Sequence, residues 1–130
     1  MIKIISPLYI YTSKNKKRII NLNNYRNWHY LTNSRIKNLY KIEMLDKLYG
    51  LKLTTPIDLH FILFKGTKRK SDRANVLSIQ EKFFCDALTY YKCIPDDNDE
   101  YINSTHYSSG GIDRENPRVE IIINTFDKSR

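Results

Sequence analysis

The chain contains little cysteine, glycine or proline, and no long apolar segment. Of its 130 residues, two are cysteine and four each are glycine and proline. Cys85 and Cys93 have no Cys-x-x-Cys partner, and the three histidines do not stand at zinc-site spacing. The sequence therefore excludes a disulfide-rich scaffold and a zinc module. Because no apolar run approaches the ~18 residues that span a bilayer and the N-terminus lacks a signal-peptide pattern, we expect a cytoplasmic protein with reduced thiols and no membrane partner.

Acidic residues are also scarce relative to basic ones. The chain has 22 lysines and arginines against 14 aspartates and glutamates, which gives a net charge of +8. Such a surplus on a small domain favours a polyanionic partner. A basic surface that only keeps the protein soluble explains the charge equally well, and a membrane surface explains it less well. Composition alone leaves nucleic acid and a solvated surface as the two main alternatives.

Length and apolar content predict one globular domain over residues 1–130. Hydrophobic residues make up 41% of the chain, enough for a single core. Apolar alternation predicts strands over 2–11 and 57–65, the second of them central in its sheet. We also expect a short strand over 18–22, a loop over 21–32, and two closing strands over 101–107 and 118–124 that form an antiparallel pair.

Two segments have the apolar spacing of helices. The first is expected to begin at Thr32 or Asn33 and to end before Gly50, a residue type common just after a helix. The second is expected to be capped by Asp72 and to run to about Tyr91. Its predicted core-facing residues are Val76, Ile79, Phe83, Phe84, Ala87 and Leu88. The order β(β)αβαββ predicts an α/β (α+β) fold with two main helices on one mixed sheet.

The residues that could carry chemistry lie between positions 68 and 101. Asn75 and Lys82 are one heptad apart, so they share a helix face that has Asp72 at its N-terminal edge. Asp86 stands one turn beyond Lys82, and an acidic turn over 96–100 follows the helix. The candidates for DNA contact are Lys68, Arg69, Lys70, Arg73 and Asn75.

This pattern suits phosphodiester cleavage with Mg²⁺. Mg²⁺ activates water and acts as a Lewis acid, and it is usually held by one or two carboxylates plus substrate phosphate. We expect Asp72, Asp96 and Asp97 to hold the ion and Lys82 to assist at the phosphate. Each part also has a plain structural explanation, namely a helix cap at Asp72, a polar turn at 96–100 and a solvated lysine at 82.

A family resemblance joins these parts. Asp72-x-x-Asn75, then Lys82, then Asp86-Ala87-Leu88, and then Asp96-Asp97 resemble the motifs of the RusA family of Holliday junction resolvases, including its phage members. The resemblance implies that Asp72 and Asp97 are metal-binding catalytic aspartates with Asp96 as their neighbour. It also implies that Lys82 is the catalytic lysine and Asn75 the asparagine that closes the first motif.

The resemblance further implies a homodimer that nicks two strands of a four-way DNA junction symmetrically. Such an enzyme acts in DNA recombination and repair, or in phage DNA processing, in the bacterial host's cytoplasm, with Mg²⁺ or Mn²⁺. Two-fold symmetry suits two equivalent scissile strands. Tyr25 and Trp28 would stack on unpaired bases near the crossover, or else pack in the ordinary way.

One departure from the family pattern affects the metal site. Ala74 stands where the family has its second aspartate. Either Asp96, Asp99 or Glu100 replaces that ligand, or water completes the coordination shell of the metal ion. This departure leaves open the alternative of a junction-binding protein with weakened or lost activity. A further alternative, independent of position 74, is another nuclease that acts on flaps or forks. Cleavage of several branched substrates with and without metal separates them.

Overall fold

The computed structural model describes residues 1–13, 16–68 and 72–125. These residues form six strands and three helices. The elements are β1 (Ile2–Ser6), β2 (Tyr9–Ser13), β3 (Lys16–Ile19), α1 (Leu22–Asn27), α2 (Tyr30–Leu48), β4 (Ile57–Lys65), α3 (Arg73–Tyr90), β5 (Ile102–Ile112) and β6 (Arg118–Thr125). None of the described helices is long and apolar enough to cross a membrane.

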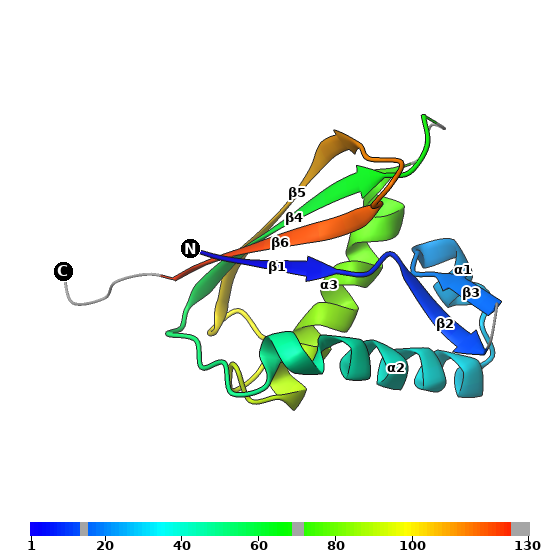
Figure 1. Cartoon of the computed structure of the whole chain (residues 1–130). Coiled ribbons are helices and arrows are strands. Elements are labelled where there is room, and N and C mark those ends of the chain that lie inside the picture. The colour runs from blue at the N-terminus through cyan, green and yellow to red at the C-terminus, as the bar shows by residue number, and fades with distance from the viewer. Residues whose placement is uncertain (14–15, 69–71, 126–130) are drawn as a thin grey trace.

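Four strands form a mixed sheet in the order β1-β6-β4-β5 (Figure 1). The pair β4–β5 is parallel, whereas β6 is antiparallel to both β4 and β1. In Figure 1, α3 runs along one face of this sheet, and α2 crosses the C-terminal half of α3. The expected α+β class, and the inner position of the strand over 57–65, are confirmed.

The expected antiparallel pair of the two closing strands is wrong, because β4 lies between β5 and β6. The reason lies in the residues of the three strands. β4 buries Ile57, Leu59 and Phe61 along one face, which suits an inner strand. β5 carries polar residues at most positions, so it suits the sheet edge, where one row of backbone groups stays in water.

The N-terminal region also differs from expectation. The single strand over 2–11 is wrong, since Pro7 interrupts it and β2 leaves the main sheet to pair with β3. The loop over 21–32 is wrong as well, because Asn21 caps α1 by accepting from the Asn24 N–H at 2.8 Å. His29 caps α2, so this helix starts before Thr32. Gly50, with φ +82°, follows the helix as expected.

The helix α3 supplies much of the core. Its cap at Asp72 and its six predicted core-facing residues are confirmed, and all six are buried. Cys85 and Cys93 are both buried and free, as expected of structural thiols. From α2 the buried side chains are Ile36, Tyr40, Met44 and Leu48.

A buried polar network joins three elements below the sheet. Ser6 Oγ and the Tyr40 hydroxyl lie 2.7 Å apart, and the Ser6 hydroxyl donates to Gln80 Oε1 at 2.6 Å. Gln80 Nε2 in turn donates to the Pro7 carbonyl at 2.8 Å. These three side chains are fully buried, so the network holds the corner between β1 and β2 against α2 and α3.

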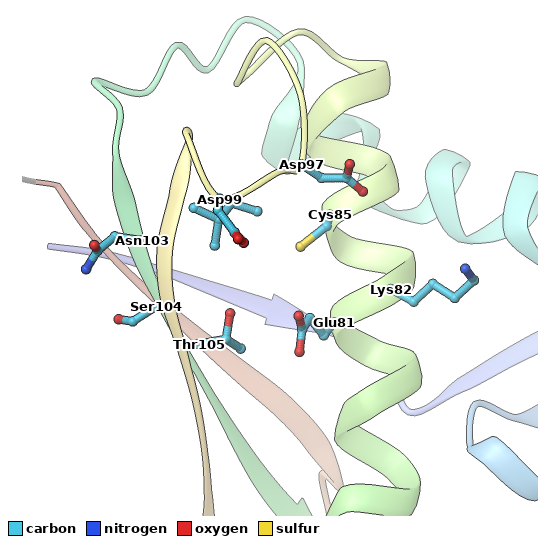
Figure 2. Close-up of a pocket in the computed structure, with 9 residues that line it drawn as sticks. Glu81, Lys82, Cys85, Asp97, Asp99, Asn103, Ser104 and Thr105 are labelled. Atoms are coloured by element: carbon cyan, nitrogen blue, oxygen red, sulfur yellow. The ribbon is translucent and has the colours of Figure 1, made fainter.

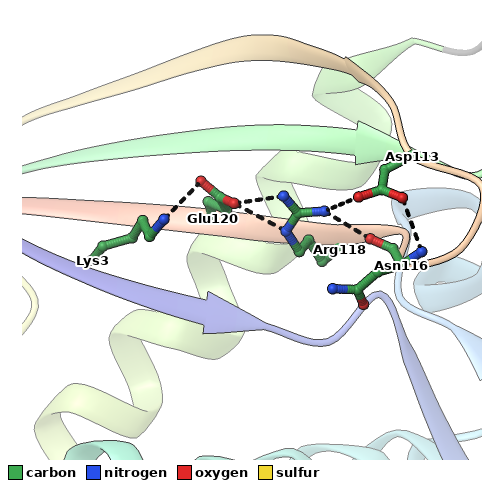
Figure 3. Close-up of polar contacts among 5 residues, drawn as sticks. All are labelled: Lys3, Asp113, Asn116, Arg118 and Glu120. Atoms are coloured by element: carbon green, nitrogen blue, oxygen red, sulfur yellow. Dashed lines mark hydrogen bonds and ion pairs between the residues drawn. The ribbon is translucent and has the colours of Figure 1, made fainter.

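Ion pairs gather on the sheet (Figure 3). The Arg118 guanidinium contacts Asp113 and Glu120, each at 2.8 Å, and covers the Phe64 ring at 4.2 Å. Lys3 lies 3.8 Å from Glu120.

Candidate functional site

A hollow of about 270 Å³ lies between α3, the acidic turn and the start of β5 (Figure 2). We call it the acidic hollow. Its lining residues are Glu81, Lys82, Cys85, Asp97, Asp99, Ile102, Asn103, Ser104 and Thr105. Three of them are carboxylates that come from two separate parts of the chain, so only the folded protein brings them together.

The chain beyond α3 turns back along the helix. Tyr91 ends α3, and the Cys93 N–H donates to the Leu88 carbonyl at 2.9 Å. Asn98 then organises the acidic turn, because its side chain accepts from the Glu100 N–H at 2.9 Å and its carbonyl accepts from the Ile102 N–H at 3.0 Å. This reversal leads directly into β5 and leaves Asp97 and Asp99 beside the middle of α3.

An irregularity in β5 shapes the floor of the hollow. The register passes from Ile57↔Ile102 to Asp58↔Ser104, which leaves Asn103 as an extra residue in β5. Asn103 Nδ2 donates to Asp58 Oδ1 at 2.9 Å, and the Ser104 hydroxyl donates to the same oxygen. The bonds from Ser104 and Asn103 lower the pKa of Asp58. Both donors are thus committed to Asp58 on the neighbouring strand.

Glu81 is held at the opposite wall. The Tyr107 hydroxyl on β5 donates a hydrogen bond to Glu81 Oε1. Burial, followed by this bond and the charge of Glu81, raises the pKa of Tyr107. The phenol therefore stays a donor at neutral pH and keeps the carboxylate in one position.

The hollow has an excess of negative charge. Partial burial, and then the carboxylates of Asp96 and Asp86, raise the pKa of Asp97. Burial, and then the charges of Glu81, Asp97 and Asp86, raise the pKa of Cys85. The Cys85 thiol therefore stays neutral between the carboxylates and is not an activated nucleophile.

The donor chemistry of the hollow fits Mg²⁺. Glu81, Asp97 and Asp99 offer hard carboxylate oxygens, and Mg²⁺ needs only one or two of them when water and phosphate complete its shell. Over the described residues, no group of three His, Cys, Asp or Glu side chains lies close enough together to hold a metal by itself.

Lys82 lies at the rim of the hollow. In Figure 2 its side chain extends away from Glu81 and Cys85. Its Nζ atom is 5.9 Å from the centroid of the Tyr25 ring on α1. The lysine predicted from the sequence is therefore adjacent to the acidic hollow but directed to its outer side.

Asp72 does not reach the acidic hollow. It lines a different depression together with Asn23 and Asn75, and its carboxylate accepts from the Ala74 N–H at 2.9 Å. A helical rise of about 1.5 Å per residue places Asp72 about 20 Å from the level of Cys85. The structure thus does not bring Asp72 together with Asp97, because the acidic turn folds back over only the C-terminal half of α3.

The other predicted residues have separate places. Asp96 uses its carboxylate within the turn, where it accepts from the Asp97 N–H at 2.8 Å and from Asn98 Nδ2 at 3.2 Å. Asn75 Oδ1 accepts from the Asn23 N–H at 3.2 Å and so ties α1 to α3. Lys68 and Arg73 are exposed near the start of α3. Arg69 and Lys70 lie outside the described residues.

Two of the carboxylates that line the hollow differ in whether the sequence analysis named them. Asp99 is one of the residues considered as a substitute for the aspartate missing at position 74, and it does line the hollow. Glu81 is not among the residues that the sequence singles out. The signal that could have found it is its position at the edge of the buried face of α3, one turn before Cys85.

No protein-family model matches this chain, and no curated protein matches it either. The resemblance to RusA-type resolvases therefore stays a prediction that rests on the motif residues themselves.

Proposed function

We propose that this protein is a Mg²⁺-dependent DNA endonuclease that cuts branched DNA, foremost four-way junctions, by paired nicks. The observation that carries this proposal is the acidic hollow, whose lining includes the carboxylates of Glu81, Asp97 and Asp99 as well as Lys82. The chain around it has a net charge of +8, which suits a polyanionic substrate. The resemblance to the RusA family is consistent with the same activity.

Each residue has a role that follows from its position. One or two carboxylates out of Asp97, Asp99 and Glu81 would hold the cation, with water and substrate phosphate as its other ligands. When bound, Mg²⁺ would polarise the scissile phosphate and activate water. Tyr107 positions Glu81 through its hydrogen bond. Lys82, at the rim, would neutralise a phosphate that lies against the hollow. Asp72 has the role of a helix cap, with no part in the chemistry.

The quaternary and cellular parts of the proposal follow from the resemblance. A homodimer would place two acidic hollows at the two equivalent strands of a junction. We propose that the enzyme works in the cytoplasm, in DNA recombination and repair or in phage DNA processing, and that Mn²⁺ can replace Mg²⁺.

Cleavage of an end-labelled four-way junction tests the proposal. The wild type should nick it with Mg²⁺ or Mn²⁺ and should leave it intact in EDTA. Asp97→Asn and Glu81→Gln should abolish nicking and keep junction binding. Asp72→Asn is the matched control, because it removes the same charge at the start of α3, away from the acidic hollow, and should keep cleavage once its folding is verified by melting.

Two outcomes would contradict these assignments. Full activity of Asp97→Asn would show that the acidic hollow is not the active site. Loss of activity in a folded Asp72→Asn protein would show that the active site lies at the start of α3 instead.

A second candidate is a junction-binding protein without nuclease activity. Ala74 and the use of Asp72 as a cap favour it, since the first family motif then contributes no metal ligand. Tight junction binding by the wild type, without cleavage of junctions, flaps or forks in either metal, would establish this candidate instead.

A further inference from the structure

Three helices meet at the ring of Tyr25. Lys37 Nζ on α2 lies 5.5 Å from the ring centroid, and Lys82 Nζ on α3 lies 5.9 Å from it. Tyr25 itself belongs to α1, which sequence patterns predict as a loop. We call Tyr25, Lys37 and Lys82 the lysine–tyrosine cluster.

The ring that organises the cluster is held in place. It packs edge-on against Phe83 of the core, with the centroids 6.1 Å apart. The Asn33 side chain, and then the charges of Lys37 and Lys82, lower the pKa of Tyr25 against the opposing effect of burial. The two ammonium groups thus share one partly buried aromatic ring.

The two lysines of the cluster keep their charge unpaired. The ion pairs of the described chain lie on the sheet, around Arg118 and Glu120, and neither Lys37 nor Lys82 takes part in one. Cation–π contact with a tyrosine leaves most of the ammonium charge available to an anion. Two such cations beside one ring are complementary in charge to an oxyanion.

We propose that the lysine–tyrosine cluster binds a backbone phosphodiester of the nucleic-acid substrate. This inference rests on the proposed function, and it identifies the surface along which a strand reaches the acidic hollow. Lys82 belongs to both places, since it lines the hollow and faces Tyr25. A phosphate on the cluster would therefore put the next part of the strand at the hollow's rim.

A third lysine extends the same surface. Lys41 stands one turn beyond Lys37 on α2, and its Nζ lies 4.8 Å from the Tyr90 ring at the end of α3. Successive turns of α2 thus present one ammonium each, beside a tyrosine ring of α1 or α3. A strand that follows these turns meets several cations in sequence, which is the arrangement that backbone binding requires.

Salt-dependent junction binding tests the cluster. Fluorescence anisotropy of a labelled four-way junction in EDTA, between 50 and 200 mM KCl, gives the slope of log K against log salt. Lys37→Gln should weaken binding and reduce the magnitude of the slope by roughly 0.9, as expected for one lost phosphate contact. Lys37→Met removes the same charge and keeps a long apolar stem, so it should give the same result if the glutamine variant folds poorly. Lys37→Arg should keep the slope.

Lys3→Gln is the matched control. It removes the same charge from the sheet, where Lys3 pairs with Glu120, and should leave the slope unchanged. If Lys37→Gln and Lys37→Met behave like Lys3→Gln, the cluster is not a phosphate site, while cleavage by the wild type would leave the proposed function intact. If the slope changes as expected and the wild type does not cleave, the phosphate site at the cluster is supported and the proposed nuclease activity is refuted. A wild type that binds no DNA overturns both.

Discussion

The Tyr107 hydroxyl on β5 donates a hydrogen bond to Glu81 Oε1 on α3, across the space between the sheet edge and the helix. The Tyr107 ring also packs edge-on against Phe61 of the central strand, with centroids 6.1 Å apart. One side chain therefore connects the core to a carboxylate of the acidic hollow. Because it acts through the Glu81 carboxylate, Tyr107 is a positioning residue for the proposed chemistry.

Replacing Tyr107 by phenylalanine should separate its hydrogen bond from its packing. The ring stays against Phe61, whereas Glu81 loses its donor, so we expect the free energy of unfolding to fall by about 1–2 kcal/mol. Junction nicking should fall by roughly 10- to 100-fold, as is typical when a residue that orients a metal ligand is lost. Urea denaturation and single-turnover nicking measure the two effects. Tyr11→Phe, at an exposed ring, should change neither, and an unaltered Tyr107→Phe enzyme would refute the positioning role.

Mg²⁺ should stabilise the folded protein through the acidic hollow. An ion that binds only the native state at ten times its dissociation constant adds about 1.4 kcal/mol to the free energy of unfolding. Thermal melts with MgCl₂, compared with KCl at equal ionic strength, should show a higher melting temperature that EDTA reverses. The shift should shrink in Glu81→Gln and Asp97→Asn and persist in Asp72→Asn. An equal shift with KCl would mean that no specific ion site exists there.

Removing the hydroxyl of Ser6 should destabilise the protein. Ser6→Ala leaves the Tyr40 hydroxyl and Gln80 Oε1 with one partner fewer in a fully buried place, and such a loss costs about 1–3 kcal/mol. Chemical denaturation measures it. Ser13→Ala, at an exposed strand end, should stay within about 0.5 kcal/mol of the wild type. Equal stabilities of the two variants would show that the network contributes little.

Asp58 should make stability depend on pH in the acidic range. Hydrogen bonds from Ser104 and Asn103 lower its pKa in the folded state below the value near 3.9 of an unfolded chain. Its contribution is therefore complete above the unfolded pKa and is lost as the pH falls through the lower, folded value. The difference in free energy of unfolding between wild type and Asp58→Asn should shrink as the pH falls from 7 to 3. A constant difference over this range would contradict the assignment.

Local sequence signals predicted α3 well. Asp72 offers a side-chain acceptor at the helix start, and the apolar residues behind it recur on one face, so both the cap and the buried face follow from neighbouring residues alone. The prediction of a loop over 21–32 was wrong for a related reason. The asparagines of this segment favour turns as readily as helix caps, and the sequence does not show that Asn21 is used as the cap of α1.

The pairing of β5 and the composition of the site could not be predicted in the same way. Strand neighbours are chosen by contacts between residues far apart in the chain, so the placement of β4 between β5 and β6 has no local signal. Glu81 looks like an ordinary solvated glutamate beside Lys82 until β5 brings Tyr107 to it. Asp72 likewise resembles a metal ligand until the turn after α3 is seen to stop short of it.

The sequence by itself determined the α+β class, the extent of α3, the buried and unpaired cysteines and the strong positive charge, because each depends on composition or on residues within a few positions of one another. Tertiary structure alone decided which carboxylates share one space and where Lys82 points. Those relationships depend on how far the acidic turn runs back along α3 and on which strand lies beside that helix. No local pattern of residues encodes either of them.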